Sequence, residues 1–481
     1  MKKVTLILLI ILMLMLNACA TQTPALQAPA ATLQAPSDTP TPPIRRRRTP
    51  TTEAPTLTPS PYVPRATDSP TATPAVSGGY TITAAYAQTG GAETTDGQIY
   101  TAGDPDQSAI YVSNAGKLTM ANATVTTSGN TTSQDNSSLH GLNAAVLAAG
   151  GSSINLTDSS AITSGSGANG AFVTDARSAV TLANVTIQTG AEGAHGVVAT
   201  NGGSLTLTDV DITTTGGSSG AIAGGQGGGT IKITGGKVIT SGQNSPDLYA
   251  TGAISVTGGT LSATASEAAV IDGNSSITLT KTSLFSTMRS WGVLIYQSTP
   301  GGAQATSGAF SMIGGSLSYD APRAPLFYVT NTSAVISLKE AILSSASMIL
   351  LQAAAGKWGA SGSNGGNVTF TADSQDLKGD LVADSLSSIS LTLKQDSTLT
   401  GTINGAHTAK SILLSMDGTT TWDVTGDSTL TCLTDPGEIY DTDVANITGH
   451  GYTVTYDASA CPNLRGRTYP LQAGGFLQPA N

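Results

Sequence analysis

Two copies of one pattern stand at residues 167–190 and 193–216: GANGAFVTDARSAVTLANVTIQTG and GAHGVVATNGGSLTLTDVDITTTG. Each copy starts with small residues and a short apolar run, turns at Asn, Asp or Gly, and then alternates Thr with aliphatic residues. The apolar run recurs at Phe172, Val197 and Ile222, 25 residues apart. This period-two alternation of β-branched residues predicts short strands, and no stretch of the chain shows sustained helical periodicity.

Three short strands and three turns, repeated about every 22 to 26 residues, predict one coil of a parallel β-helix. Each strand then pairs with its counterpart one coil onward, and inward Val, Ile and Leu stack into a column. Gly, Asn and Asp tolerate the left-handed backbone of tight corners, and the chain has 56 glycines. We therefore expect an all-β fold, a right-handed parallel β-helix. A β-sandwich or propeller is the alternative, and uneven coil spacing is its best support.

The repeat is strongest over residues 78–372, which we assign to the β-helix. It weakens over residues 373–481, where we expect continued β coils and a cap that covers the last coil. Insertions interrupt the period between Thr127 and Leu142, between Pro300 and Pro325, and between Ala353 and Val368. Loops are expected to project there, and loops carry function more often than coils do.

The N-terminus has the pattern of an export signal. Two lysines precede an apolar run from Val4 to Leu16, which is shorter than the roughly 20 residues that a helix needs to cross a bilayer. The run ends in Leu-Asn-Ala-Cys, and this string resembles the lipobox of bacterial lipoproteins. By that resemblance residues 1–18 are a signal peptide and Cys19 carries the lipid that anchors the protein to a membrane. An ordinary secretory signal is the alternative.

Residues 19–77 are expected to form a disordered stalk. They are rich in Thr, Pro and Ala, and they contain 13 of the 22 prolines of the chain. Such a composition cannot build a core and favours extended conformations of about 3.1 Å per residue. Arg45 to Arg48 form a basic run that we interpret as solvated, with anionic headgroups or wall polymers as the alternative partner.

The repeats and their turn residues, together with the lipoprotein-type start, resemble pectin-lyase-like right-handed β-helix proteins, especially adhesin-like surface members. The resemblance is one of architecture and not of motif. It implies an extracytoplasmic protein at the cell surface that binds a partner, a glycan or matrix without catalysis. It also keeps open a polysaccharide lyase or glycoside hydrolase on the same scaffold.

Charge and cysteine content narrow the possible partners. Residues 78–481 hold 28 Asp and Glu against 14 Lys and Arg, which argues against nucleic acid. Cys432 and Cys461 are the two cysteines of this region, and an exported compartment permits a disulfide between them. Two free buried thiols are the alternative. Neither CxxC nor Cys/His spacing indicates zinc, and we expect no cofactor.

Candidate catalytic groups are few. Asp209 and Asp211 lie about 7 Å apart on one strand face, within the range that glycosidases need, but Asp209 sits in a turn-like string. His195 has the pKa of a general base, yet it occupies a corner position. Acids also cluster at Asp435, Glu438, Asp441 and Asp443 without a known calcium-loop spacing, and solvated loops are favoured there. We assign no catalytic or metal-binding residue.

The sharpest functional hypothesis concerns the first strand of each coil, where three apolar residues stand in succession. Side chains alternate between the two faces of a strand, so all three cannot enter the core. If the outer two face inward, the middle residues draw an apolar stripe along the helix, of the kind that proteins keep for partners. Coverage of the stripe by a loop or a terminal segment is the alternative. The predicted stripe consists of Tyr111, Val146, Phe172, Val198, Ile222, Tyr249, Val270, Leu294 and Tyr328.

Function follows as an expectation: a lipid-anchored extracytoplasmic β-helix that binds a glycan or protein ligand without being an enzyme. Besides the lyase or hydrolase, a structural protein that associates with itself through the stripe or the helix ends stays open. The sequence leaves the ligand, the membrane and the oligomeric state undetermined.

Overall fold

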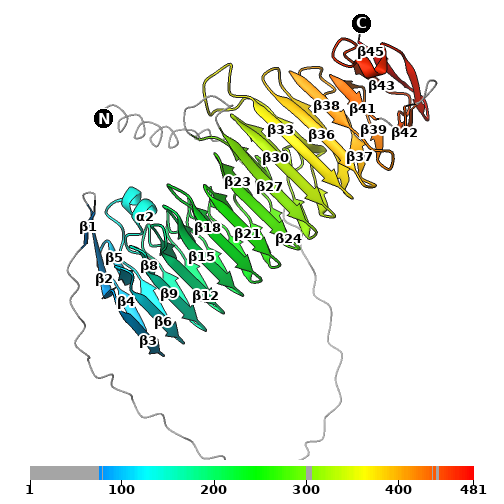
Figure 1. Ribbon diagram of the computed structural model, residues 1–481. Coiled ribbons are helices and arrows are strands. Elements are labelled where there is room, and N and C mark those ends of the chain that lie inside the picture. Colours follow the sequence, from blue (N-terminus) through cyan, green and yellow to red (C-terminus); the bar gives the residue numbers. More distant parts are fainter. Residues whose placement is uncertain (1–74, 78–79, 299–305, 436, 440–443, 481) are drawn as a thin grey trace, which may run out of the picture. The chain divides into compact units, whose positions relative to one another are not determined.

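The computed structural model describes residues 75–77, 80–298, 306–435, 437–439 and 444–480. They form a parallel β-solenoid, in which strands of successive coils pair in order along the chain (Figure 1). The strands build a first sheet of 13 strands, a second of 10, a third of 14 and a fourth of 8. The predicted all-β parallel solenoid is therefore confirmed, and the sandwich and propeller alternatives are excluded.

The first sheet collects the first strand of nearly every coil. Its members are β1 (Ala75–Ser77), β2 (Tyr80–Thr89), β5 (Gln107–Ser113), β8 (Val146–Ala148), β11 (Ala171–Val173), β14 (Val197–Ala199), β17 (Ile222–Gly224), β20 (Leu248–Ala250), β23 (Ala269–Asp272), β26 (Val293–Tyr296), β29 (Phe327–Thr330), β32 (Ile349–Ala353) and β35 (Asp380–Ala383).

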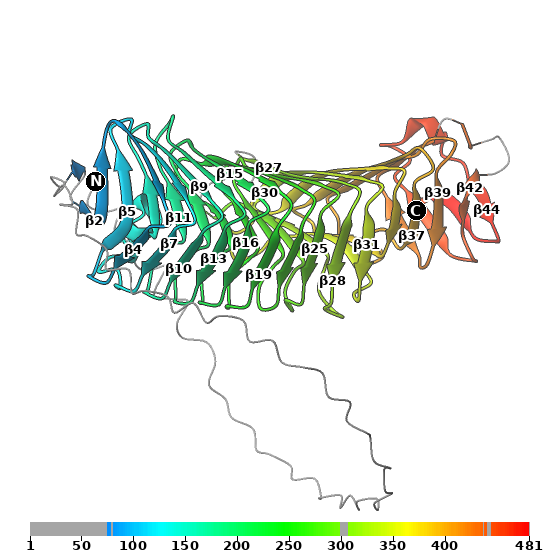
Figure 2. The same ribbon diagram turned by 90° about the horizontal axis from the view of Figure 1, so that it is seen from below.

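The second sheet, seen along its length in Figure 2, begins at one end of the solenoid and stops at β31. Its members are β4 (Ile99–Ala102), β7 (Thr124–Thr127), β10 (Ser160–Thr163), β13 (Thr186–Thr189), β16 (Asp211–Thr214), β19 (Lys237–Thr240), β22 (Thr260–Ala263), β25 (Ser283–Ser286), β28 (Ser316–Tyr319) and β31 (Ile342–Ser345).

The third sheet is the longest ladder and continues past residue 373 without a break. Its members are β3 (Ala92–Asp96), β6 (Lys117–Ala121), β9 (Ser153–Thr157), β12 (Ala179–Ala183), β15 (Gly203–Thr208), β18 (Gly229–Thr234), β21 (Ala253–Thr257), β24 (Ser276–Thr280), β27 (Ser307–Ile313), β30 (Thr332–Lys339), β33 (Gly366–Asp373), β36 (Ser388–Lys394), β38 (Ser411–Ser415) and β41 (Cys432–Thr434).

The fourth sheet replaces the second beyond β31 and includes the only antiparallel pair, β44 with β45, among its described strands. Its members are β34 (Asp376–Lys378), β37 (Thr398–Gly401), β39 (Thr421–Val424), β40 (Ser428–Leu430), β42 (Val444–Thr448), β43 (Thr453–Tyr456), β44 (Tyr469–Gln472) and β45 (Phe476–Pro479).

The coil from β11 to β13 shows why the sequence folds in this way. Val180 and Leu182 alternate with exposed or half-buried neighbours along β12, and both side chains are buried in the main core. Val180 pairs with Leu205 of the next coil, and Ile187 pairs with Ile212. Like residues therefore stack above one another, which gives every coil a partner for its apolar face.

Corner residues form a second regular column. Asp158, Asn184 and Asp209 all adopt the left-handed backbone, with φ of 48°, 53° and 50°. The Asn184 side chain donates a hydrogen bond to the Asp158 carboxylate at 3.1 Å. Asn and Asp tolerate this conformation better than other side chains, so they supply the turn without needing glycine.

Two insertions fold back over the first sheet. Residues 128–145 include the helix α2 (Gln134–His140), which has Ser133 as its N-cap and Gly141 as its C-cap. Residues 354–365 join β32 to β33. Both lie at interruptions where the sequence predicts loops, whereas part of the third interruption, residues 299–305, lies outside the described residues. No described helix is long and apolar enough to span a membrane.

The C-terminal end departs from regular coils. The predicted disulfide is confirmed, because Cys432 and Cys461 are bonded, and a short 3-10 helix (Pro462–Leu464) follows the second cysteine. Tyr456 is fully buried here and donates a hydrogen bond to the Arg467 carbonyl at 2.7 Å. These residues close the last coils, as a terminal cap requires.

Candidate ligand-binding site

A row of outward-facing residues runs along the first sheet. The strand pairings place Tyr111 beside Leu147, Leu147 beside Phe172, and so on up the ladder. Seven of the nine residues predicted for the stripe lie in this row. The row consists of Tyr111, Leu147, Phe172, Val198, Ala223, Tyr249, Val270, Leu294 and Tyr328.

Val146 and Ile222 point the other way, so their assignment to the stripe is corrected. Val146 pairs with Ile110 and Ile222 with Val197, and all of these side chains belong to the main core. In each strand the neighbouring residue, Leu147 or Ala223, takes the outward place. A shift of one residue exchanges the two faces of a strand, and a run of small apolar residues permits either register.

The N-terminal part of the row is sealed. We call this set the closed cluster: Ile82, Tyr111, Ala144, Leu147, Ala149, Phe172, Val198 and Ala223, all of them buried. Gly141, at the end of α2, lies directly over Phe172, because a Cβ there would approach the Phe172 ring to 2.6 Å. The predicted stripe is thus not a continuous exposed surface. Over the closed cluster it is covered by the loop that contains α2 and by the N-terminal lead-in.

Polar contacts hold α2 in place over the closed cluster. Gln134 donates to the Gly193 carbonyl at 3.3 Å, and Asn169 donates to the Ser137 carbonyl at 3.4 Å. The His140 ring stacks on Tyr80 of β2 with centroids 3.9 Å apart. Burial lowers the pKa of His140, while the Asp175 carboxylate raises it. A helix of seven residues is too short to be stable alone, so these contacts fix it.

The C-terminal part of the row is only partly covered. We call this set the open cluster: Tyr249, Val270, Trp291, Leu294, Tyr296, Tyr328, Ala354 and Trp358. Trp291 stacks on Tyr328 with centroids 4.9 Å apart and an interplanar angle of 6°. Trp358, from the second insertion, contacts Tyr296 at 4.6 Å and Trp291 at 5.8 Å. Trp291 and Trp358 remain half-buried, so aromatic surface reaches solvent.

The loop that carries Trp358 is held by the side-chain amide of one of its own residues. Asn364 donates to the carbonyls of Gly356 and Trp358, both at 2.8 Å. The Lys357 ammonium lies 4.6 Å from the centroid of the Trp358 ring. A cation over an indole face is attracted to the ring quadrupole. The site is therefore preformed, with one positive charge at its rim.

Tyrosine hydroxyls and one carboxylate line the floor of the open cluster. Tyr249 donates to Asp272 at 3.0 Å, and the second Asp272 oxygen accepts from the Ser298 amide at 2.9 Å. Burial raises the pKa of Tyr249 well above its usual range, and the Tyr296 and Asp272 side chains raise it further. Burial also raises the pKa of Tyr328. These hydroxyls therefore stay neutral at physiological pH.

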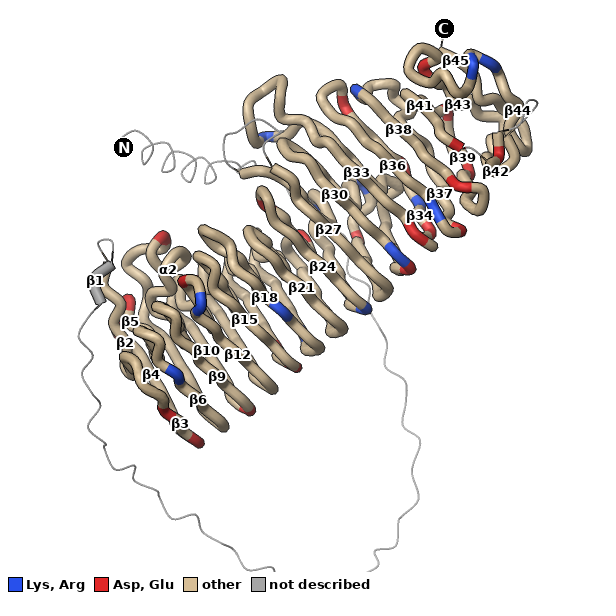
Figure 3. Tube along the Cα trace, in the orientation of Figure 1, with Lys and Arg blue, Asp and Glu red and all other residues tan. Residues whose placement is uncertain are grey.

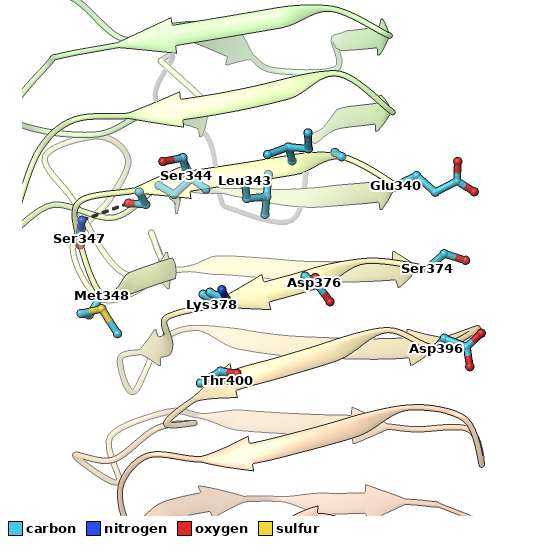
Figure 4. A pocket seen from close by; sticks show the side chains of 14 residues that line it. Glu340, Leu343, Ser344, Ser347, Met348, Ser374, Asp376, Lys378, Asp396 and Thr400 are labelled. Carbon is cyan, nitrogen blue, oxygen red and sulfur yellow. Dashed lines mark hydrogen bonds between the residues drawn. The ribbon is translucent and has the colours of Figure 1, made fainter.

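A separate groove lies where the second sheet ends. Among the described strands, β31 pairs only with β28 and β34 only with β37, and a cavity of about 770 Å³ opens between β31 and β34. The Gln375 amide bridges the gap to Ala341, donating to its carbonyl at 2.7 Å. Figure 4 shows Glu340 and Asp396 at one end of the groove and Met348 at the other.

The candidate catalytic residues occupy structural positions. Asp209 is the corner residue described above, and Asp211 accepts a hydrogen bond from the Lys237 amide at 2.9 Å. His195 lies with its Nδ1 3.2 Å from the Gly220 carbonyl, and burial lowers its pKa. Figure 3 shows charged residues mostly as isolated positions along the coils. Within the described part of the chain, no three His, Cys, Asp or Glu side chains are grouped to hold a metal ion.

Other predicted residues fall outside the described chain. Cys19 does so, and with it the lipid anchor and residues 19–74 of the stalk, as do Asp441 and Asp443 of the acidic cluster. Residues 75–77, which the sequence assigned to the disordered stalk, instead form β1 and pair with β2, so this boundary is corrected. Trp291 and Trp358 were missed by the sequence reasoning, which followed only the middle residues of strands. Trp358 lies in a predicted insertion, and a tryptophan in an inserted loop is the signal that could have identified it.

Comparisons of the chain with protein-family models, with curated proteins and with solved structures find no match.

Proposed function

We propose that this protein is a non-enzymatic surface solenoid that binds a glycan through the open cluster. The observation that carries the proposal is the stacked pair of Trp291 and Tyr328 beside Trp358, half open to solvent on an otherwise regular scaffold. Trp and Tyr combine a large apolar face with a polar edge and little conformational freedom, so they dominate many recognition sites.

The chemistry of the open cluster suits a sugar. A pyranose presents an apolar face of C–H groups, which packs against a flat ring, and a rim of hydroxyls, which needs hydrogen bonds. Trp291 and Trp358 offer the rings, while Lys357 offers a donor at the rim. The loop bearing Trp358 is already ordered by Asn364, so binding costs little additional conformational entropy.

The N-terminal residues give the proposed setting. An apolar signal that ends in Leu-Asn-Ala-Cys supports a lipid on Cys19, and the Pro- and Thr-rich residues 19–77 support a stalk. A stalk of that length holds a domain at most roughly 170 to 180 Å from a membrane. We infer an adhesin-like role, in which the solenoid meets glycans of the surroundings or of a neighbouring cell.

The test is a glycan and matrix array probed with the full chain and with Trp291→Ala and Trp358→Ala variants. Tyr452→Ala is the matched control, because Tyr452 is 40% exposed and lies in β-turn structure far along the chain from the open cluster. Specific binding that both tryptophan variants lose and the control retains supports the proposal. Binding that is indifferent to both tryptophans would contradict it.

Polysaccharide cleavage is the second candidate, and the groove beside β31 favours it. Glu340, Asp376 and Asp396 all line this groove, and paired carboxylates are what a glycosidase requires. All three residues are exposed, however, and Asp376 accepts a hydrogen bond from Thr398 at 2.8 Å. Release of reducing sugar from any array ligand, abolished by Asp376→Asn, would favour hydrolysis over binding.

A further inference from the structure

Three oxygen atoms near the C-terminal end are buried without a hydrogen-bond partner in the described chain. Two belong to the carboxylate of Asp435, which directly follows β41 and is 2% exposed. The third is Oδ1 of Asn446 in β42, a residue that is 9% exposed. The amide nitrogen of Asn446 is used, since it donates to the Thr420 carbonyl at 3.0 Å.

Backbone hydrogen bonds bring the segments that carry these oxygens together: the Ala445 amide donates to the Glu438 carbonyl at 3.1 Å, and the Met416 amide donates to the Thr434 carbonyl at 2.9 Å. Burial raises the pKa of Asp435 to about 6, the nearby Asn446 side chain lowers it, and the Glu438 and Asp417 carboxylates raise it further. Glu438 lies over the adjacent turn, because its Oε1 would be 3.2 Å from a Cβ placed on Gly418. Asp435, Glu438 and Asn446 thus lie on neighbouring segments of the chain.

Asp417 has its partners already. Its carboxylate accepts hydrogen bonds from the Gln395 amide at 2.8 Å and from the Thr419 hydroxyl at 2.8 Å. Asp435, by contrast, has no Lys, Arg or His within ion-pair distance in the described part of the chain. Burying an unpaired carboxylate is strongly unfavourable, and buried charges in proteins are paired or coordinate a metal.

We propose that the Asp435 carboxylate, the Asn446 side-chain oxygen and the Glu438 carboxylate bind a Ca²⁺ ion. All of these donors are hard oxygens, and Ca²⁺ takes six to eight such ligands in adaptable geometry, with water or backbone carbonyls completing the shell. The proposed ligand set holds two carboxylates and one amide. It is therefore compatible with the finding that no three His, Cys, Asp or Glu side chains are grouped to hold a metal ion in the described part of the chain. His and Cys, the ligands that favour zinc, are not among the donors.

The ion would have a structural role. Asp435 follows the strand that carries Cys432, and Asn446 lies in the strand that pairs with β39 and β44. A bound Ca²⁺ would cross-link the end of the third sheet to the fourth, next to the disulfide. The cap would then resist unfolding in an extracytoplasmic compartment, where Ca²⁺ is available.

The experiment measures Ca²⁺ binding to the chelator-treated full chain by calorimetry at pH 7.5 and constant ionic strength, together with Tm. We expect one site per chain and a Tm that rises by several degrees with Ca²⁺, because a ligand that binds only the folded state stabilises it. Asp435→Asn should lose binding and the Tm rise. Asp104→Asn is the matched control, since Asp104 is exposed and lies far from the C-terminal end along the chain, and it should retain both.

Asp435→Asn also gives a test that does not depend on binding heat. In chelator, this variant should be at least as stable as the wild type, because it removes an unpaired buried charge, whereas in Ca²⁺ the order should reverse. Asn446→Asp should bind Ca²⁺ more tightly, since it adds a ligand charge. Absence of binding by the wild type, with Tm rising only on acidification, would show that a proton fills the site and would overturn the proposal. Equal binding by Asp435→Asn would overturn it too.

Discussion

The closed and open clusters are two regions of one row that differ in their cover. In the closed cluster, α2 and the first strands bury every residue, and Phe172 is 0% exposed. In the open cluster, Tyr328 is 7% exposed beneath Trp291, but Trp291 and Trp358 keep part of their surface in solvent. Both insertions arise at breaks in the coil period, and both land on the same face.

The difference teaches that an outward apolar row can be fully covered or left partly exposed. A short insertion that packs over the row completes a second core, which stabilises the coils beneath it. A loop that contributes an aromatic ring leaves a shaped apolar surface for a ligand instead. Exposure, and not apolar character, separates the closed cluster from the open cluster for which we propose ligand binding.

Removal of the fully buried ring from the closed cluster should have the largest effect. Phe172→Ala leaves a cavity beneath α2, and we expect a loss of about 3 to 5 kcal/mol in the free energy of unfolding. Denaturant unfolding followed by circular dichroism measures it. Glycan binding by the folded variant should be unchanged. A loss below about 1 kcal/mol would mean that the closed cluster is not a core.

A substitution that displaces α2 without leaving a cavity should have a smaller effect on stability. Gly141 has φ of 75°, and a Cβ there would meet Phe172. Gly141→Ala should therefore cost about 1 to 2 kcal/mol from the backbone alone and loosen α2. Faster amide exchange over residues 134–140, with the coils beneath unaffected, is the expected result. Unchanged protection of α2 would show that α2 tolerates the contact between the added Cβ and Phe172.

Truncation of a side chain in the open cluster should weaken ligand binding more than it lowers stability. Trp358 is half-buried on a loop, so Trp358→Ala should cost only about 1 kcal/mol of stability. Its loss should weaken glycan binding by at least about tenfold, as expected for an aromatic anchor. Stability follows from thermal unfolding and affinity from titration with an array ligand. A large loss of stability without a change in affinity would show that the open cluster is a structural core like the closed cluster.

Acid should weaken the packing of α2 on the closed cluster, and this effect on protection should be small. Burial holds the pKa of His140 below its usual 6.5 in the folded chain, so the unfolded chain takes up a proton more readily. The contribution of His140 to stability is present above pH 6.5 and is lost as pH falls below it. Amide exchange over residues 134–140 at pH 7.5 and pH 5.5, with correction for intrinsic rates, measures the change. His140→Phe should abolish the pH dependence of that protection.

Alkali should act on the open cluster. Burial raises the pKa of Tyr249 and Tyr328, so the folded chain keeps both hydroxyls neutral where the unfolded chain ionises. Their contribution is present below pH 10 and is lost as pH rises above it. Tyrosinate absorbance recorded against pH should show a late-titrating group that Tyr249→Phe reduces. Titration of all tyrosines near pH 10 would contradict the burial of these rings.

The regular part of the fold could be predicted from sequence because each coil repeats the same local information. Corner Asn and Asp and alternating aliphatic residues specify turns and strand faces one coil at a time. The register of Val146 could not be read in this way, since Ala145, Val146, Leu147 and Ala148 fit either face. Pairing with Ile110 of the preceding coil decides it.

The site was harder to predict because it depends on contacts between distant segments. Trp291 and Trp358 are 67 residues apart and meet only when the second insertion folds back onto the row. Burial of Asp435 likewise depends on how β41 and β42 are placed, and its neighbours in sequence suggest a solvated acidic loop. Local patterns specify strands, whereas loops that return to the scaffold are fixed by packing.

Tryptophan fluorescence during titration with a glycan selected from the array tests the central claim most directly. The chain has three tryptophans: Trp291 and Trp358 lie in the open cluster, and Trp422 is 0% exposed in the core. We predict a saturable change in emission that follows the binding isotherm and disappears in Trp291→Phe with Trp358→Phe, while Trp422 emission stays constant. Saturation of binding with no change in the emission of the wild type would place the ligand elsewhere and contradict the account.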